Sequence, residues 1–420
     1  MLWGEILGSD ERGHGQVMRS TIPPISDKRM AVRVTAAAER AIRGGHPWLF
    51  ASGVESVSFN GRAGDLAVIF DRKRRFLAIG LYDPHSPIQV RILQQGQPAA
   101  IDAAWFEQKI EAAAEIRAGL PATATTGYRL VHGENDGLPG LVVDRYADTL
   151  VMKLYTAAWL PHLQEVIAAV TAVSQPQHLV LRLSRATQKR ETFGLTDGQL
   201  LAGEPLAGPV HFQENGLWFA ADVVYGQKTG FFLDQRENRA RVERLAGGKS
   251  VLNLFAYTGG FSLYAARGGA RQVVSVDLSE PALATAVNNF ALNQITTPHE
   301  LLAGDAFQLM AELAANGRRF DMVIIDPPSF AKKQSEVAGA LAAYGRLVGS
   351  GLKLLQPGGT LVIASCSSRI DAASFFDLVH ETAQEVGRPL REIERSGHPL
   401  DHPVGFKEGA YLKCLFALAP

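Results

Sequence analysis

A carboxylate and a thiol each follow directly after an apolar run, in two separate parts of this 420-residue chain. Residues 322–325 lead into Asp326-Pro327-Pro328, and residues 360–364 lead into Ser365-Cys366. If both runs are strands of an open α/β sheet, their ends meet at the edge where such sheets bind ligands. Two prolines fix the path of the chain after Asp326. The pattern predicts that Asp326 and Cys366 act in one pocket.

The thiol suggests covalent chemistry on a pyrimidine. A thiolate that adds to carbon 6 of the ring makes carbon 5 nucleophilic enough to attack a methyl sulfonium. Cationic or dipolar surroundings would promote the deprotonation that this requires. A lone cysteine at a strand end is more often inert packing, but Asp-Pro-Pro at this edge is typical of methyltransferases that act on nucleobases. We expect Cys414, which has no such neighbours, to lie in the core.

Residues 250–277 have the pattern of a nucleoside-binding half-fold. An apolar strand meets a tight Thr258-Gly259-Gly260 turn, a helix follows, and a second strand ends in Asp277. The loop is not G-x-G-x-x-G, the pattern that holds a dinucleotide pyrophosphate at a helix N-terminus. S-adenosylmethionine has no phosphate and suits this loop better. Asp277 is placed to accept from both ribose hydroxyls, although a carboxylate that caps a helix is an alternative interpretation.

Asp305 follows the third predicted strand in the sequence Gly304-Asp305-Ala306. In methyltransferases of this shape, an aspartate here hydrogen-bonds the adenine amino group. A helix N-cap explains the residue equally well, so both interpretations stay open.

Strand and helix patterns alternate from residue 250 to near the C-terminus, which favours a doubly wound, parallel α/β sheet. Before it we predict a loose N-terminal extension, a small β-rich module, a connector helix and a central α+β domain. The extension's place relative to the natural start stays open. The predicted boundaries are 1–30, 31–98, 99–118, 119–205 and 206–420, and the predicted strands of the last part are 250–256, 272–276, 299–302, 321–325, 359–364 and 410–417.

Composition narrows the functional classes. Lysine and arginine number 42 and aspartate and glutamate 42, so no overall field attracts nucleic acid, although a local basic face is sufficient for RNA. Two cysteines exclude a disulfide framework and a cysteine-rich zinc site, and we expect no metal. Because no apolar run reaches transmembrane length, we expect a cytoplasmic protein without a membrane partner.

Two basic segments could contact RNA. One is the run Arg72–Arg75, and the other is the segment 182–190, with Arg182, Arg185, Lys189 and Arg190. Each is either a solvated loop or a surface that contacts phosphates.

After residue 30, nearly the whole chain resembles the RlmI-type (YccW-like) ribosomal RNA large-subunit methyltransferases. Residues 39–40, 45–48 and 88–91 (ER, GHPW and IQVR) resemble a PUA domain, an RNA-binding β-barrel. Residues 132–144 (HGENDGLPGLVVD) are similar to the connecting domain of that family. Residues 227–236 (QKTGFFLDQR) are similar to its first cofactor motif, which covers the methionine end of S-adenosylmethionine.

The resemblance implies methyl transfer from S-adenosylmethionine to carbon 5 of a cytidine in large-subunit ribosomal RNA. Cys366 would be the nucleophile, and Asp326 would hold the base at its pyrimidine edge. Many RNA cytosine methyltransferases carry a second cysteine after the Asp-Pro-Pro-type motif, where this chain has Ser329, so the group that removes the carbon-5 proton is unassigned. The Ser-Cys pair is also similar to RNA uracil-5 methyltransferases, so the identity of the base stays open.

Three other functions stay open at this point or are disfavoured. A base-nitrogen methyltransferase would need no thiolate. A non-catalytic RNA-binding or ribosome-assembly protein would have little reason to keep Asp277, Asp305, Asp326 and Cys366 together. A nicotinamide-dependent oxidoreductase is disfavoured by the glycine pattern and by Asp-Pro-Pro.

The expected partners are large-subunit ribosomal RNA or its assembly particle, and a homodimer stays open. The candidate cofactor contacts are Lys228, Thr229, Phe231, Asp234, Arg236, Phe255, Ala256, Tyr257, Thr258, Gly259, Asp277, Leu278, Ser279, Asp305, Ala306 and Asp326. The candidate RNA contacts are Pro327, Pro328, Phe330, Lys332, Lys333, Arg185 and Arg190. Phe330 could stack on a base or pack in the core.

Overall fold

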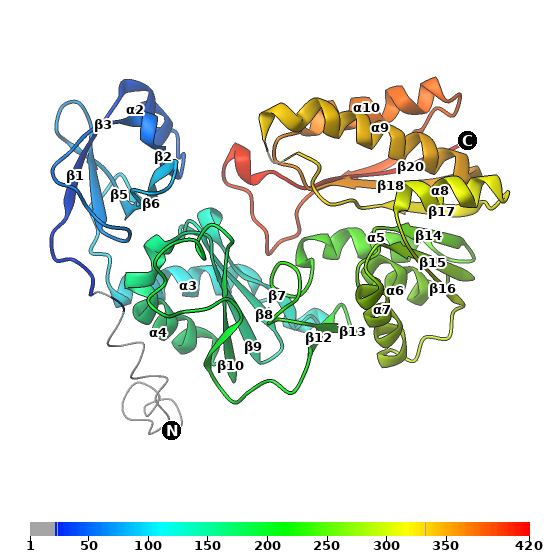
Figure 1. The fold of residues 1–420 in the computed structure, drawn as a ribbon, viewed down its shortest axis with the longest axis horizontal. Helices are drawn as coiled ribbons and strands as arrows, with labels where there is room; N and C mark the ends of the chain where they lie inside the picture. The colour runs from blue at the N-terminus through cyan, green and yellow to red at the C-terminus, as the bar shows by residue number, and fades with distance from the viewer. Residues whose placement is uncertain (1–21, 23, 332) are drawn as a thin grey trace. The chain divides into compact units, whose positions relative to one another are not determined.

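The computed structural model describes residues 22, 24–331 and 333–420 (Figure 1). Most of the predicted N-terminal extension, residues 1–21 and 23, and the candidate RNA contact Lys332 therefore lie outside the described residues. The chain forms two compact units. The first contains the chain up to Gln213 together with Ala221–Phe231 and Leu400–Phe406, and the second contains Glu214–Ala220, Phe232–Pro399 and Lys407–Pro420.

The first unit begins with a six-stranded mixed sheet in the order β2-β6-β5-β4-β1-β3. Helix α2 (Ala36–Arg43) starts where the Thr35 side chain accepts a hydrogen bond from the Ala38 amide. The basic run Arg72–Arg75 lies in the turn between β4 and β5, where the Asp71 carboxylate binds Arg75 and Arg43. The strands are β1 (Met30–Val34), β2 (Trp48–Phe50), β3 (Val54–Val57), β4 (Leu66–Phe70), β5 (Phe76–Tyr82) and β6 (Ile88–Gln95).

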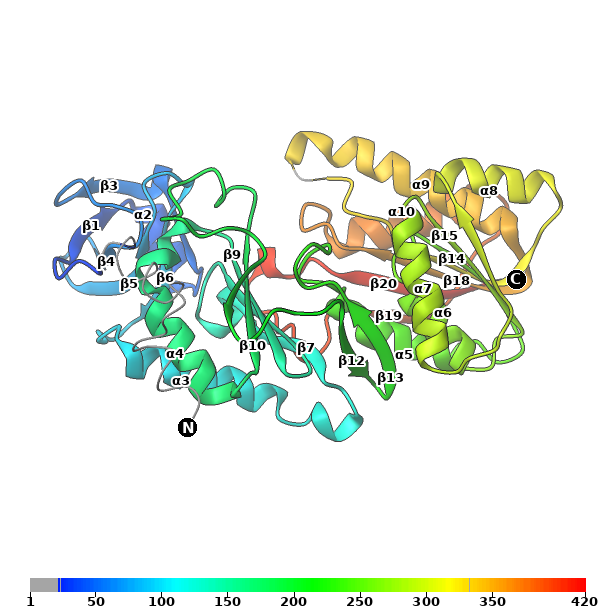
Figure 2. The same cartoon turned by 60° about the horizontal axis from the view of Figure 1, so that its bottom comes forward.

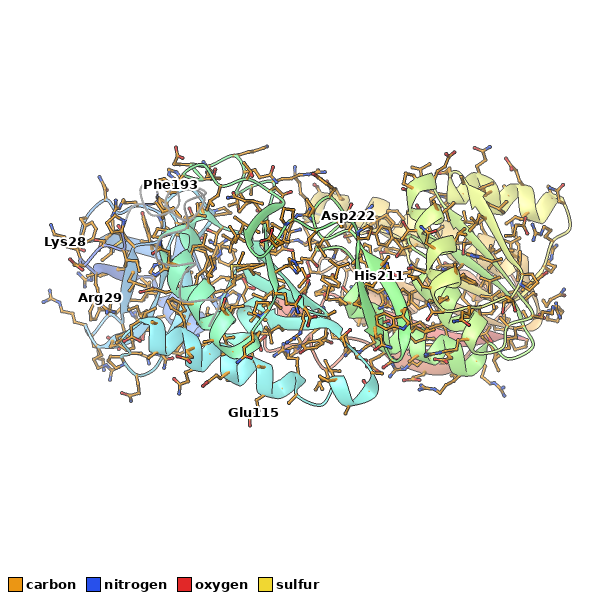
Figure 3. All side chains as sticks on the ribbon, turned by 90° about the horizontal axis from the view of Figure 1, so that it is seen from below. Lys28, Arg29, Glu115, Phe193, His211 and Asp222 are labelled. Atoms are coloured by element: carbon orange, nitrogen blue, oxygen red, sulfur yellow. The ribbon has the colours of Figure 1, made fainter. Side chains whose placement is uncertain are left out.

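A second sheet of the same unit has the order β11-β10-β9-β8-β7. Helices α3 (Ala103–Arg117) and α4 (Leu163–Ser174) bury apolar residues in a core that also contains Leu66, Ile79 and Leu81 of the first sheet. Glu115 on the opposite face of α3 points into solvent (Figure 3). The strands are β7 (Gly127–His132), β8 (Leu141–Tyr146), β9 (Thr149–Leu154), β10 (His178–Leu183) and β11 (Gln199–Ala202). A short hairpin of β12 (Val210–Glu214) and β13 (Leu217–Ala221) follows.

The second unit is a seven-stranded sheet in the order β16-β15-β14-β17-β18-β20-β19. The first five strands in this order are parallel, and β20 and β19 are antiparallel to their neighbours. The strands are β14 (Ser250–Leu254), β15 (Gln272–Asp277), β16 (His299–Ala303), β17 (Phe320–Ile325), β18 (Leu355–Ser365), β19 (Arg391–Ser396) and β20 (Lys413–Ala419). The structure thus confirms the doubly wound α/β fold, with an antiparallel end to the sheet.

Helices cover both faces of this sheet, with α8, α9 and α10 on one face and α5, α6 and α7 on the other (Figures 1 and 2). The helices are α5 (Arg236–Leu245), α6 (Gly260–Arg267), α7 (Glu280–Leu292), α8 (Ala306–Ala315), α9 (Val337–Leu354) and α10 (Ala372–Glu385). This burial explains the continuous apolar runs of the central strands. In the described part of the chain, no helix combines the length and apolarity needed to cross a membrane.

Candidate active site

The predicted chemical residues lie at the carboxyl edge of the seven-stranded sheet. The order of strands along the chain reverses between β14 and β17, and such a switch point opens a crevice beyond the strand ends. Asp277 ends β15, Asp326 follows β17 and Cys366 follows β18. The sheet therefore brings the predicted cofactor carboxylate and both predicted catalytic residues to one edge.

The loop after β14 has a backbone that L-residues rarely adopt. Phe255 has φ 58°, Tyr257 has φ 48° and Gly259 has φ 76°. A Cβ atom on Gly259 would lie 2.7 Å from the Cβ of Ala286, so only glycine fits against α7. Strained backbone of this kind persists where surrounding contacts hold it and is common at ligand sites.

Asp277 is one of those contacts. Its carboxylate accepts hydrogen bonds from the Tyr257 amide (2.8 Å) and from the Ser279 amide (2.9 Å). The N-cap of α7 is Ser279, whose side chain accepts from the Ala282 amide. The structure therefore does not support the alternative interpretation of Asp277 as a helix cap.

The features of this loop fit S-adenosylmethionine. Thr258 Oγ1 is buried and has no hydrogen-bond partner among the described residues, which leaves a polar atom for a ligand to satisfy. Ala256 is buried, and Leu278 is exposed beside Asp277. A ribose at Asp277 and the adenine against Leu278 would agree with the predicted roles, which remain predictions.

Asp305 is the N-cap of α8, since its Oδ1 accepts from the Gln308 amide over 3.0 Å. The capping interpretation is therefore present in the structure. Ala306, the first residue of the helix, is buried. The predicted contact of Asp305 with the adenine amino group stays a prediction.

A chain of polar side chains holds Asp326. The Gln235 amide donates to Asp326 Oδ1 over 2.8 Å, and Asn238 donates to Gln235 Oε1 over 2.6 Å. Ser396 on β19 in turn donates to Asn238 Oδ1 over 2.5 Å. This chain of hydrogen bonds fixes the orientation of the Asp326 carboxyl group. Sequence reasoning missed Gln235 and Asn238, although Gln235 lies within the segment 227–236.

A hydrogen bond joins the loop after Asp326 to the loop after Cys366. Ser367 Oγ, one residue after the half-buried Cys366, donates to the Ala331 carbonyl oxygen over 3.2 Å. Ser329, in the same loop as Ala331, donates to the same oxygen over 3.2 Å. The segment after Asp-Pro-Pro and the segment after Cys366 are thus fixed to one another.

Tyr344 on α9 supports the end of β18. Its hydroxyl donates to Ser365 Oγ over 3.0 Å, and its ring packs on Phe330 at 5.1 Å between centroids. Burial raises the pKa of Tyr344, and the charges of Cys366 and Asp326 raise it further. The phenol therefore stays protonated at neutral pH, and Phe330 has a packing role in this structure.

Cys414 is fully buried on β20, and burial raises the pKa of its thiol well above the ordinary value. It is therefore an inert core residue, as the sequence predicted.

Side chains of the segment 227–236 are largely engaged within the protein. In the first unit, Thr229 Oγ1 donates to Asp144 over 2.5 Å, and Phe231 packs on Phe212. In the second unit, Asp234 accepts from the Tyr411 hydroxyl over 2.9 Å, and Arg236 is only 1% exposed. The cofactor contacts expected of these residues and of Lys228, which belongs to the first unit, stay predictions.

The candidate RNA contacts differ in exposure. Pro328 and Lys333 are exposed, and Pro327 is buried. In the first unit, Arg185 and Arg190 are exposed, with Arg190 donating to the His85 carbonyl oxygen over 3.0 Å.

Arg182 does not belong to the basic surface that the sequence suggested for the segment 182–190. It is only 7% exposed, pairs with Asp197 over 3.0 Å and donates to the Gly226 carbonyl oxygen. All residues of β10 after His178 are buried, Arg182 among them, so this arginine is not available to RNA.

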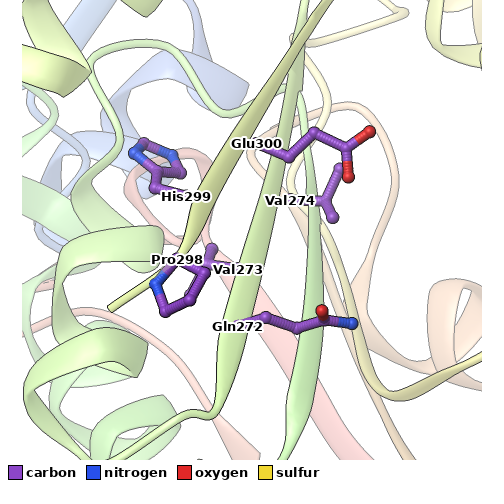
Figure 4. Close-up of a pocket in the computed structure, with 6 residues that line it drawn as sticks. All are labelled: Gln272, Val273, Val274, Pro298, His299 and Glu300. Atoms are coloured by element: carbon purple, nitrogen blue, oxygen red, sulfur yellow. The ribbon is translucent and has the colours of Figure 1, made fainter. Parts of the chain in front are cut away.

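A hollow of about 250 Å³ lies at the opposite end of the sheet, lined by the first residues of β15 and β16 (Figure 4). Its lining includes Gln272 and His299, and neither belongs to the carboxyl edge. It is therefore distinct from the candidate active site.

Comparison with known proteins agrees with this geometry. A family model described as S-adenosylmethionine-dependent methyltransferase matches residues 154–417, and one described as PUA-like domain matches residues 32–95. A ribosomal RNA large subunit methyltransferase from Deinococcus radiodurans is 49% identical over 401 residues, which cover 94% of this chain and 98% of the relative. This chain belongs to the ribosomal RNA large subunit methyltransferase family. It is an enzyme whose cofactor is S-adenosylmethionine.

Other relatives of the methyltransferase support the same assignment. The ribosomal RNA large subunit methyltransferase I of Shewanella amazonensis is 39% identical over 391 residues, covering 92% of this chain and 98% of the relative. A solved structure from Streptococcus mutans, described as a SAM-dependent methyltransferase, is 23% identical with a TM-score of 0.80. It covers 93% of this chain and 100% of its own, and it confirms the fold.

Proposed function

We propose that this methyltransferase transfers a methyl group to carbon 5 of a cytidine in large-subunit ribosomal RNA, through a covalent bond to Cys366. The names of the relatives support the RNA substrate. The observation that carries the chemistry is the hydrogen bond from Ser367 to the Ala331 carbonyl oxygen, because it fixes the Cys366 and Asp326 loops together at the sheet edge.

The reaction proceeds in three steps. The Cys366 thiolate adds to carbon 6 of the cytosine, which places electron density on carbon 5. S-adenosylmethionine, when bound, would supply the methyl group: the electron pair at carbon 5 takes the methyl carbon, and the methyl–sulfonium bond breaks with its electron pair left on the cofactor sulfur as a thioether. A base then removes the carbon-5 proton, the carbon–sulfur bond breaks, and the sulfur leaves as thiolate.

Asp326 orients the base. Held by Gln235, its carboxylate can accept a hydrogen bond from the amino group of cytosine. The oxygen that uracil carries at the same place would be repelled by the carboxylate. This favours cytosine over uracil as the substrate.

The group that removes the carbon-5 proton stays unassigned. Ser329 is a weak base, and its hydroxyl is engaged with the Ala331 carbonyl oxygen. Tyr344 stays neutral because burial raises its pKa.

Asp277, Thr258 and Asp305 would hold the cofactor, and Lys333, Arg185 and Arg190 would contact phosphates of the RNA. The PUA-like module, proposed as residues 31–98, would position the RNA. The substrate would be the free RNA or its assembly particle, and a ribosomal substrate supports the expected cytoplasmic location.

Mass mapping of ribosomal RNA from cells with and without this protein tests the proposal. We expect one large-subunit cytidine to carry a carbon-5 methyl group only when the protein is present, and to lose it when Cys366→Ala replaces the wild type. A methyl group on a base nitrogen, or full methylation by Cys366→Ala, would contradict the covalent route.

A further inference from the structure

Lys413 is a buried cation next to the candidate nucleophile. It is the first residue of β20, pairs with Ser365 in the antiparallel register of β18 and β20, and is only 3% exposed. Cys366 is the residue directly after Ser365. The register therefore places Lys413 beside the end of the strand that presents the thiol.

The ammonium group of Lys413 holds the segment that follows Cys366. It donates to the carbonyl oxygens of Ser367, of Ile370 (2.6 Å) and of Tyr411 (3.2 Å). These three bonds match the three donors of an ammonium group. Two of them fix the ends of the turn 367–370, so this turn is anchored by one charged side chain.

The charge of Lys413 calls for an explanation, because neutral donors could bond the same carbonyl oxygens without the cost of burying a charge. Burial lowers the pKa of Lys413 to about 8, while the charges of Cys366 and Asp371 act in the opposite direction. This interaction is mutual, because a thiolate that favours the ammonium is itself favoured by the ammonium.

We propose that Lys413 is a positioning residue for methyl transfer, whose ammonium group both holds the turn 367–370 and favours the thiolate form of Cys366. This inference rests on the proposed function, in which Cys366 attacks the base. Lys413 contacts neither substrate nor cofactor in this role and acts through the cysteine.

The other titratable groups around the thiol explain why a cation is needed there. Asp326 follows β17 at the same sheet edge, and the charges of Asp326 and Cys366 both help to raise the pKa of Tyr344 from α9, which stays neutral. Asp371, which caps α10, balances part of the Lys413 charge. Lys413 therefore supplies the positive charge that interacts with Cys366.

The thiol of Cys366 can be measured without RNA. The rate of alkylation by iodoacetamide follows the thiolate fraction, and Cys414, the one other cysteine of the sequence, is fully buried. The pH profile of the alkylation rate, with the product mapped to Cys366, is measured on the full-length wild type, Lys413→Gln and Lys413→Arg. Glutamine keeps donors for the carbonyl oxygens but has no charge, and arginine keeps both.

We expect the midpoint of the Lys413→Gln profile to lie about one pH unit or more above that of the wild type, so alkylation below the midpoint slows roughly tenfold. Lys413→Arg should restore the wild-type midpoint. Lys249→Gln is the matched control, because Lys249 is a partly buried lysine that donates to Thr360 in the middle of β18, away from the strand end that leads into Cys366. Its profile should equal that of the wild type.

Equal midpoints for the wild type and Lys413→Gln would overturn the inference. Should Lys413→Gln fail to fold, as judged by cofactor binding, Lys413→Met is measured instead, with the same expected shift and the same contradicting result. Methylation by Cys366→Ala is a separate test. If that variant still methylates RNA, the covalent function fails, but the alkylation profiles still decide the role of Lys413.

Discussion

At the scale of single residues, the site depends on side chains that hold the reactive groups. Asp326 is bonded to Gln235, Gln235 to Asn238, and Asn238 to Ser396. These bonds fix the rotamer of the carboxylate before the substrate binds. The carboxylate is then already oriented to accept a hydrogen bond from the base.

Replacing Gln235 by leucine should therefore impair base recognition. Loss of a hydrogen bond to a charged group costs about 1.5–3 kcal/mol, so kcat/KM for RNA methylation should fall roughly 10- to 100-fold, while cofactor affinity changes little. Steady-state kinetics and calorimetric titration of S-adenosylmethionine measure the two effects.

Gln308→Leu is the control for this change, since Gln308 on α8 is exposed and its side-chain amide donates to Glu312. A normal kcat/KM in Gln235→Leu would show that Asp326 does not depend on this bond.

At the scale of elements, the loop after β14 is held in an unusual backbone conformation. Its positive φ angles at Phe255, Tyr257 and Gly259 are held by Asp277 and by the close approach of α7. In this conformation Thr258 Oγ1 has no hydrogen-bond partner among the described residues and is left for a ligand.

Gly259→Ala should destabilise this loop. The positive φ alone costs an L-residue about 1 kcal/mol, and the clash with Ala286 adds to this cost. We expect a lower midpoint of urea unfolding and a weaker affinity for S-adenosylmethionine.

Gly248→Ala separates the cost of the positive φ from the cost of the clash with Ala286. Gly248 has φ 69°, and a Cβ there would meet nothing within 4 Å. This variant should show the smaller loss of stability and normal cofactor binding. If both variants bind the cofactor equally well, the close approach to α7 does not shape the cofactor site.

His299 on β16 should make the stability of the second unit depend on pH. Its ring stacks on Phe290 at 4.0 Å, and burial lowers its pKa to about 4 from the ordinary 6.5. The unfolded chain therefore binds a proton between about pH 6.5 and pH 4 that the folded chain excludes. The stability of the unit should fall as the pH falls through this window.

Thermal unfolding of the wild type and of His299→Gln from pH 7 to pH 4.5 measures this contribution. Glutamine cannot titrate and can still hydrogen-bond Ser275, the partner of the His299 ring. The unfolding temperature of the wild type should decrease more steeply with falling pH. Parallel curves would exclude His299 as the cause.

The sequence predicted those elements whose pattern is set by burial. The apolar strands 250–256, 272–276 and 321–325 coincide with β14, β15 and β17 within two residues. Strand β19 was not predicted, because its residues Arg391-Glu392-Ile393-Glu394-Arg395-Ser396 are largely charged, as expected for an edge strand.

The partners of side chains could not be predicted in the same way. Gln235 and Asp326 are 91 residues apart, and Lys413 lies 46 residues from Ser367. Only the packed sheet shows that they meet. The burial of Arg182 could not be predicted either. Its exposed neighbours Arg185, Lys189 and Arg190 suggest a basic surface, whereas Arg182 pairs with Asp197 in the folded protein.

At the scale of the whole molecule, positive and negative residues balance, so RNA binding must come from local charge. Arg185 and Arg190 on the first unit are exposed, and they remain the proposed phosphate contacts there. Each contact of this kind releases counterions when RNA binds.

The double variant Arg185→Gln/Arg190→Gln should weaken RNA binding and reduce the slope of log K against log salt by about one to two. Affinity measured over a series of salt concentrations gives this slope. Lys353→Gln, at an exposed position in the last turn of α9, is the matched control and should leave the slope unchanged. An unchanged slope in the double variant would exclude these arginines as phosphate contacts.

The central claim is that Cys366 forms a bond to carbon 6 of a cytosine. RNA that contains 5-fluorocytidine tests it most directly, because fluorine replaces the proton whose removal releases the enzyme. With S-adenosylmethionine present, we predict a stable protein–RNA adduct that carries the transferred methyl group, with the RNA attached to Cys366 in the peptide map. Cys366→Ala should form no adduct while still binding the cofactor. Methylation of normal RNA without any adduct on the fluorinated RNA, or an adduct at another residue, would contradict the account.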